Sequence, residues 1–164
     1  MLTGAYHVVT SPLALAAMGG LIAALMGVGE TLSLGCAGVA AVSAAATAAL
    51  PRHFAPFVAP AAVVVVGLSA SAGLQPRTVV AALLALMAGL ATGIATDLDV
   101  PSWEGVIGVA GTVLFIIGGA VAGLDDLNRM PRLARVLPIG RRVLGSWVAA
   151  IGLLLGALAV RMAG

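Results

Sequence analysis

The charged residues of this chain divide it into six uncharged stretches, each close to the length of a membrane-crossing helix. A helix that spans the hydrocarbon core of a bilayer needs about 20 consecutive, predominantly apolar residues. The uncharged stretches are Leu2 to Gly29, Thr31 to Pro51, His53 to Pro76, Thr78 to Thr96, Gly105 to Leu124 and Val143 to Val160. We therefore predict an all-α polytopic integral membrane protein, a single domain over residues 1–164 built as a bundle of six transmembrane helices. The predicted spans lie near residues 8–27, 31–50, 54–73, 78–96, 104–124 and 143–161.

The composition agrees with this prediction and excludes several classes of function. Hydrophobic residues make up 62% of the chain and charged residues 9%, whereas a soluble domain is about one-quarter charged. A soluble enzyme is therefore excluded, and the sequence offers no set of nucleophile, base and orienting group that predicts catalysis. The net charge of +2 is too small to indicate a nucleic-acid partner. The single cysteine, Cys36, excludes a disulfide framework and a thiolate zinc cluster.

The arginines are distributed unevenly between the two sides of the predicted bundle. One side carries Arg77, Arg129, Arg132, Arg135, Arg141 and Arg142, and the other carries only Arg52 and Arg161. Because basic residues favour the cytoplasmic side, we predict a cytoplasmic loop at residues 125–142. Both termini are then expected on the outer side of a bacterial-type inner membrane. Met1 to Val9 contains no Lys or Arg, so the first helix is expected to be retained rather than cleaved as a signal peptide.

Ionisable side chains on the predicted outer side are candidates for a metal site. They are His7, His53, Asp97, Asp99 and Glu104. Imidazole together with carboxylate suits divalent transition metals such as nickel, zinc or copper. The best candidates are His7, Asp97 and Asp99, because the two aspartates directly follow the fourth predicted span and precede a proline. The alternative is that all these side chains are solvated ends of loops.

Arginine recurs every three residues in the predicted cytoplasmic loop, at Arg129, Arg132 and Arg135. Apolar residues occupy positions between them, which is typical of a short helix lying on the inner leaflet. Together with Arg141 and Arg142, these side chains are expected to contact anionic lipid. The alternative is a docking surface for a soluble partner protein.

Glycine pairs with GxxxG spacing occur in three of the predicted spans. The pairs are Gly89 with Gly93, Gly119 with Gly123, and Gly152 with Gly156. Small residues on one face allow close approach of helix backbones, which is important in lipid because no hydrophobic force draws helices together. We expect these glycines to pack helices within the bundle. The alternative is contact with other membrane subunits or with a second copy of the chain.

The order of these features resembles the HupE/UreJ family of small nickel permeases. Family members carry an HPxxGxDH motif in an early helix, and His7 falls at its first position in the stretch from His7 to Ala14. A second family motif, close to HGHAHGxExP, aligns with the stretch from Gly93 to Pro101, where Asp99 falls at the glutamate. The stretch from Arg142 to Ala159 is similar to the last helix of the family.

The chain departs from both motifs at residues that the family uses as ligands. Leu13 and Ala14 replace the aspartate and the second histidine of the first motif. Ile94 and Thr96 replace histidines of the second motif. One imidazole and a carboxylate do not by themselves discriminate nickel from commoner ions.

Two hypotheses of different classes follow from the sequence. The resemblance implies a divergent permease for divalent nickel or cobalt, the ion being the transported substrate, with His7, Asp97 and Asp99 forming its outer metal site. The alternative is a non-transporting membrane scaffold subunit that retains the permease-like fold. Such a subunit is expected to bind a larger membrane complex through its small-residue faces.

Overall fold

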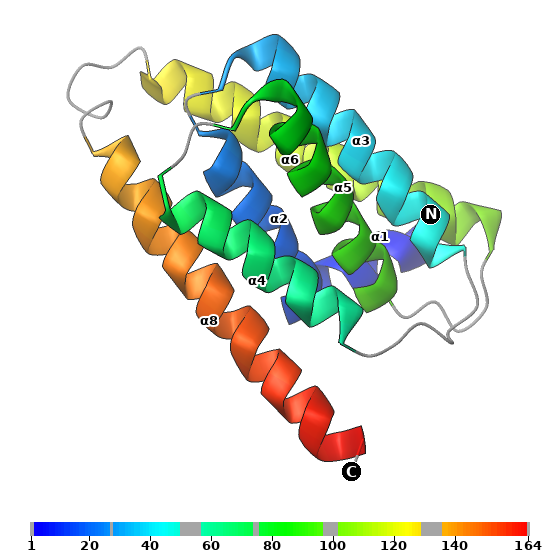
Figure 1. Ribbon diagram of the computed structural model, residues 1–164. Helices are drawn as coiled ribbons and strands as arrows, with labels where there is room; N and C mark the ends of the chain where they lie inside the picture. Colours follow the sequence, from blue (N-terminus) through cyan, green and yellow to red (C-terminus); the bar gives the residue numbers. More distant parts are fainter. Residues whose placement is uncertain are drawn as a thin grey trace.

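The structure is a computed structural model that describes residues 2–26, 28–49, 57–73, 76–96, 102–128 and 136–163. The described residues form helices joined by turns, and no strand occurs among them. The helices are α1 (Leu2–Thr10), α2 (Pro12–Leu25), α3 (Glu30–Ala48), α4 (Val58–Ser71), α5 (Thr78–Ala95), α6 (Trp103–Asn128) and α8 (Leu137–Ala163). They pack side by side as a bundle (Figure 1). The predicted all-α class is confirmed for the described part of the chain.

The first predicted span, residues 8–27, is divided into two helices in the structure. α1 ends at Thr10 and α2 begins at Pro12, with Ser11 extended between them. Proline lacks a backbone N–H and fixes its own φ, so it suits the first position of a helix and disrupts an interior. Ser11 is the N-cap of α2, and its Oγ accepts a hydrogen bond from Ala14 N at 3.3 Å. The local Ser-Pro sequence therefore breaks a stretch that contains no charge.

Among the residues that the structure describes, four helices are long enough and apolar enough to cross a membrane. The segments concerned are Glu30–Ala48, Thr78–Ala95, Trp103–Leu124 and Leu137–Arg161. α2 and α4 are apolar but only 14 residues long each, which corresponds to roughly 21 Å of helix against a hydrocarbon core of about 30 Å. The four long helices indicate a membrane location. Six crossings, an inner membrane and outer termini remain predictions.

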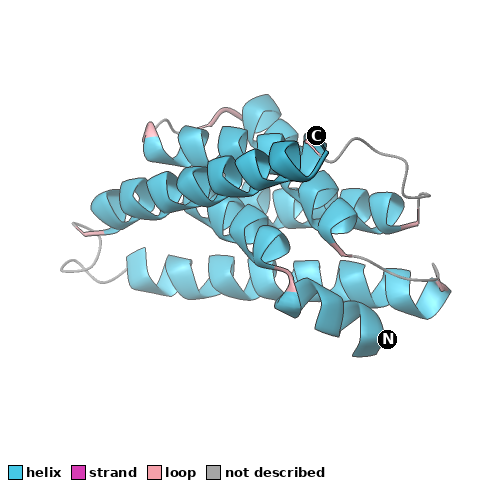
Figure 2. Cartoon of the chain, turned by 90° about the horizontal axis from the view of Figure 1, so that it is seen from below, coloured by secondary structure: helices cyan, strands magenta, loops and turns pink. Residues whose placement is uncertain are grey.

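α2 lies at the centre of the bundle (Figure 1). It contacts α1, α4, α5, α6 and α8, and most of its residues are buried, while Leu15 on the remaining face is exposed. α3 packs against α5 and α6, and α4 packs against α5 and α8. Successive helices from α2 onwards alternate in direction, so α2, α4 and α6 end at the end of the bundle where α3, α5 and α8 begin (Figures 1 and 2).

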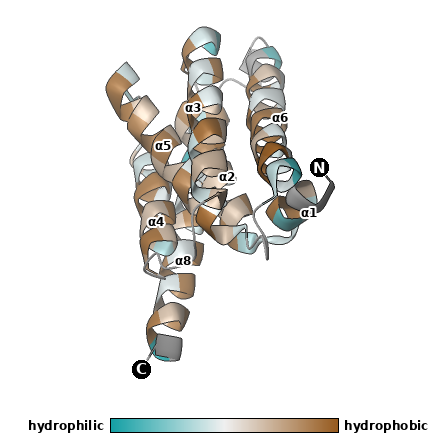
Figure 3. Ribbon diagram, turned by 90° about the vertical axis from the view of Figure 1, so that its right-hand side faces the viewer, coloured by the Kyte–Doolittle hydropathy of each residue, from teal (hydrophilic) through white to brown (hydrophobic). Residues whose placement is uncertain are grey.

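Hydrophobic residues occur along all the helices (Figure 3), and many large apolar side chains are exposed on the outside of the bundle. Trp103 and Phe115 of α6 are 82% and 81% exposed, and Trp147 of α8 is 68% exposed. Soluble monomers rarely expose contiguous apolar surface of this kind. In a bilayer the same side chains face acyl chains, while the helices satisfy their own backbone hydrogen bonds.

α6 and α8 extend into the region predicted as a loop at residues 125–142. α6 continues to Asn128, and α8 begins at Leu137. Arg141 and Arg142 therefore belong to α8. The arginines of the predicted surface helix, Arg129, Arg132 and Arg135, lie outside the described residues.

Candidate functional site

His7 lies in the last turn of α1, just before the break between α1 and α2. Its ring is half-buried and meets the exposed ring of Tyr6 edge to face, with the ring centroids 6.0 Å apart. The His7 carbonyl oxygen accepts a hydrogen bond from Ser11 N at 3.1 Å. His7 therefore lies at a helix junction, at the end of the bundle where α5 ends and α6 begins (Figure 1).

The remaining residues of the predicted metal site, Asp97 and Asp99, lie outside the described residues, and so does His53. Within the residues that the structure describes, no three His, Cys, Asp or Glu side chains come together in a group able to hold a metal ion. The structure thus places one of the three predicted ligands, His7. α5 ends at Ala95, at the same end of the bundle as His7.

Hydroxyl groups inside the helices are bonded to their own helix. Thr92 Oγ1 donates to the Ala88 carbonyl at 2.8 Å, and Thr96 Oγ1 donates to the Thr92 carbonyl at 2.9 Å. Ser43 Oγ likewise donates to the Ala40 carbonyl at 3.1 Å. Such bonds satisfy the hydroxyl donors locally, as is usual for serine and threonine in membrane helices.

The glycines of α5 lie against the backbone of α3. A Cβ added to Gly89 would collide with Ser43 Oγ and with the Ala40 carbonyl oxygen. A Cβ added to Gly93 would collide with Thr47 Oγ1, and it would stand 2.9 Å from Thr47 Cβ. Only glycine fits at these two positions without a shift of the neighbouring helix. The α3–α5 contact is therefore one place where the GxxxG spacing coincides with close helix approach.

A second close contact joins α4 and α8. A Cβ on Gly67 of α4 would lie 2.9 Å from the Gly145 carbonyl oxygen of α8, and a Cβ on Gly152 would lie 3.0 Å from Val64 N. A Cβ on Gly156 would meet only Pro60 Cβ at 3.5 Å, an ordinary contact. The contacting positions of α8, Gly145, Ala149, Gly152 and Gly156, follow helical spacings of four, three and four residues.

Sequence reasoning from GxxxG pairs alone missed Gly67 and Gly145. The signal that reveals Gly145 is its spacing of seven residues from Gly152, which places both on one face of α8. Gly67 is a single glycine in its helix and has no comparable signal.

The outer face of α6 also carries glycines, but these face open space. A Cβ added to Gly111, Gly118, Gly119 or Gly123 would meet nothing within 4 Å. We call these four residues the α6 glycine face. Their positions repeat at helical intervals around Phe115, whose side chain is also exposed. Unlike Gly89 and Gly93, they have no neighbouring helix among the described residues.

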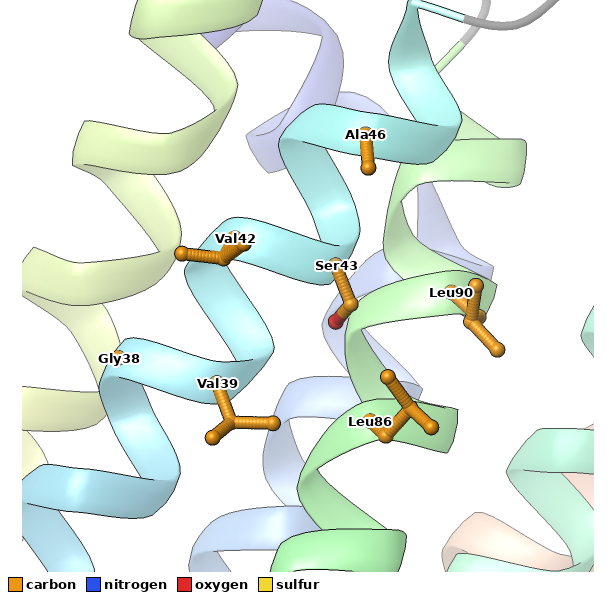
Figure 4. A pocket seen from close by; sticks show the side chains of 7 residues that line it. All are labelled: Gly38, Val39, Val42, Ser43, Ala46, Leu86 and Leu90. Carbon is orange, nitrogen blue, oxygen red and sulfur yellow. The ribbon is translucent and has the colours of Figure 1, made fainter.

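An apolar groove with a volume of 530 Å³ runs between α3 and α5 (Figure 4). Its lining residues are Gly38, Val39, Val42, Ser43, Ala46, Leu86 and Leu90. The only side-chain polar atom in this lining is the Ser43 hydroxyl oxygen, which lies between the two helices. The groove therefore offers van der Waals contact and little polar selectivity to anything that occupies it.

The two arginines near the start of α8 have different surroundings. Arg141 is only 6% exposed, and its terminal nitrogen donates to the Met26 carbonyl at the end of α2 in a long hydrogen bond of 3.5 Å. A cation at this position is favoured by the partial negative charge at a helix C-terminus. Arg142 is exposed and lies beside Gly73, in the turn after α4. Arg141 thus lies inside the bundle, while Arg142 remains accessible to lipid.

Comparisons with protein-family models, with curated protein sequences and with solved structures return no match to this chain. The resemblance to the nickel permeases therefore rests on the motif residues of the sequence.

Proposed function

We propose that this chain is a non-transporting scaffold subunit of a larger membrane assembly. The observation that carries the proposal is the contrast between glycines of one chain. Gly67, Gly89, Gly93 and Gly145 permit close contact with a neighbouring helix, whereas the α6 glycine face meets nothing within 4 Å.

The energetics of glycine support a partner for α6. Each glycine within a helix destabilises it by about 1 kcal/mol relative to alanine, so the four residues of the α6 glycine face cost α6 roughly 4 kcal/mol. In lipid, small residues regain stability when another helix packs closely on them, through dispersion contacts and weak hydrogen bonds. The exposed Phe115 ring lies on the same helix and adds apolar contact area. A second copy of the chain and a different membrane subunit both satisfy these requirements.

The test is to purify the full chain from its native membrane in a mild detergent and to determine the composition of the complex. We expect the wild-type chain to co-purify with a stable partner or with a second copy. Gly119→Leu, which fills the α6 glycine face, is expected to reduce this association at least tenfold. Ala150→Leu adds bulk to an exposed position of α8 and serves as the matched control. Equal association in both variants would contradict the proposal.

A divalent-cation permease is the second candidate function, because His7 lies at an interrupted helix. Broken membrane helices commonly line ion sites in transporters, since the interruption frees backbone groups. In a permease of this kind, the side chains of His7, Asp97 and Asp99 replace part of the hydration shell of the ion. His7 is neutral when it coordinates the ion. The transported nickel or cobalt is substrate rather than resident cofactor.

The two functions are separated by metal accumulation in cells that express the protein. As a permease, the chain is expected to raise cellular nickel or cobalt, Asp99→Asn to abolish the accumulation and His7→Ala to weaken it. Glu30→Gln, at the exposed start of α3 at the opposite end of the bundle, is the control. Accumulation no higher than in cells with an empty vector excludes the permease.

A further inference from the structure

Arg142 lies against the turn that follows α4. Its Nε and one terminal nitrogen lie 3.0 Å and 3.2 Å from the point where a Cβ on Gly73 would stand. Gly73 has a φ of +69°, a backbone conformation that glycine adopts without strain. The turn therefore leaves space for the guanidinium group, which packs along the protein surface at this end of the bundle while remaining exposed.

A second exposed arginine, Arg77, lies at the same end of the bundle. Arg77 is the exposed N-cap residue of α5, four residues after Gly73. Among the residues that the structure describes, no carboxylate forms an ion pair with Arg77 or Arg142. Glu30 and Asp126 are located at the same end of the bundle and are exposed. The end thus presents two exposed guanidinium groups from two different helices.

An apolar strip on α8 follows Arg142. Ala150, Leu153, Ala157 and Val160 are all exposed, and their spacings of three, four and three residues place them along one face of the helix, which is also the face of Arg142. Trp147, which is exposed on another face of α8 little more than one turn after Arg142, has the type of side chain that favours the boundary between headgroups and acyl chains. A cationic group at one end of an exposed apolar strip matches a phospholipid, which has an anionic phosphate and an apolar acyl chain. A free phosphate ion has no apolar part that could contact the strip.

We propose that Arg142, assisted by Arg77, binds the phosphate of an anionic phospholipid whose acyl chain lies along the apolar strip of α8. Arginine suits this role because its planar guanidinium donates two parallel hydrogen bonds to phosphate oxygens. The neighbouring Arg141 is not available, because it is buried and donates to α2. This proposal is independent of whether the chain is a scaffold or a permease.

The test measures lipid retained by the full chain in mild detergent, using native mass spectrometry with phosphatidylglycerol and with phosphatidylcholine. We expect the wild-type protein to retain phosphatidylglycerol preferentially. Arg142→Gln is expected to lower this retention about fivefold, since one arginine near an anionic membrane surface contributes roughly that factor. Arg161→Gln removes the same charge from the exposed far end of α8 and is expected to leave retention unchanged.

Other variants of the two arginines, and binding of inorganic phosphate, test the same site. If Arg142→Gln does not fold, Arg77→Gln is expected to give a smaller loss in the same direction, and Arg142→Lys is expected to retain most of the binding. The effect of inorganic phosphate on the unfolding temperature separates a lipid from a free anion. Stabilisation by millimolar phosphate equal to that by phosphatidylglycerol overturns the lipid assignment. Equal retention of the two lipids, or equal losses in Arg142→Gln and Arg161→Gln, overturns the site.

Discussion

The α4–α8 contact and the outer face of α6 place the same residue type in opposite environments. Gly67 and Gly145 stand so close to the facing helix that an added Cβ has no room, whereas Gly119 and Gly123 face open space. Gly119 and Gly123 have GxxxG spacing, but Gly67 and Gly145 do not belong to any GxxxG pair. GxxxG spacing therefore indicates a helix face able to pack closely, while the location of the partner helix depends on the fold.

The largest effect is expected from filling the α4–α8 contact. Gly67→Leu forces a branched side chain against the backbone of α8, and overpacking of this kind destabilises by about 3 kcal/mol. The free energy of unfolding of the isolated chain, measured by titration with a denaturing detergent, checks this value. Gly119→Leu is the matched control and is expected to change the same quantity by about 0.5 kcal/mol or less. Similar losses in both variants would remove the distinction between the two regions.

A smaller difference is expected within one GxxxG pair. Gly152→Ala brings a methyl group to 3.0 Å from Val64 N, whereas Gly156→Ala brings one to 3.5 Å from Pro60 Cβ. We expect the first change to destabilise by about 1–2 kcal/mol, through crowding against backbone. The second is expected to be neutral or slightly stabilising, because alanine is the better helix former. The same unfolding titration compares them, and a larger loss for Gly156→Ala would show that the face of α8 is misassigned.

The smallest effect on stability is expected in the α6 glycine face. Gly111→Ala adds a methyl group where nothing lies within 4 Å, so only the gain in helix propensity remains, about 0.5–1 kcal/mol of added stability. Gly89→Ala makes the same chemical change in the α3–α5 contact and is expected to destabilise. Opposite signs of the two changes in unfolding free energy would show that Gly89 is packed against a helix and that Gly111 is not. A loss of stability in Gly111→Ala would indicate that this part of α6 is already covered.

Much of the fold follows from charge and proline in the sequence. The uncharged stretches predict helices that the structure contains from α3 onwards. The break at Ser11 and Pro12 could also have been predicted, because Ser-Pro is a strong signal for the start of a helix. The spans were predicted from charged positions, and no charged residue marks this break. The start of α8 at Leu137 was harder to predict. Burial of Arg141 at the start of α8 is accompanied by a hydrogen bond to the Met26 carbonyl at the end of α2, far away in the sequence.

The candidate sites were less predictable than the helices, since each depends on which faces meet. His7 could be selected by residue type, but its half-buried position depends on the packing of α1 against α6. The groove between α3 and α5 is lined by Val39, Val42 and Leu86, which have no chemical feature to distinguish them from other apolar residues. Arg142 was predicted to contact lipid, whereas its position beside Gly73 requires the three-dimensional arrangement of α4 and α8.

The central position of α2 has a consequence for biogenesis. The ribosome synthesises α2 early, yet α2 contacts α4, α5, α6 and α8, all of which emerge later. Gly20 shows this most clearly, because its nearest neighbours are Val66 and Val148. During synthesis α2 therefore lacks its native contacts with α4, α5, α6 and α8 until each of these helices has been made. Folding of this bundle is thus dominated by contacts between distant parts of the chain, which are slow to form, and the contacts of α2 with α8 form only after α8 has been synthesised.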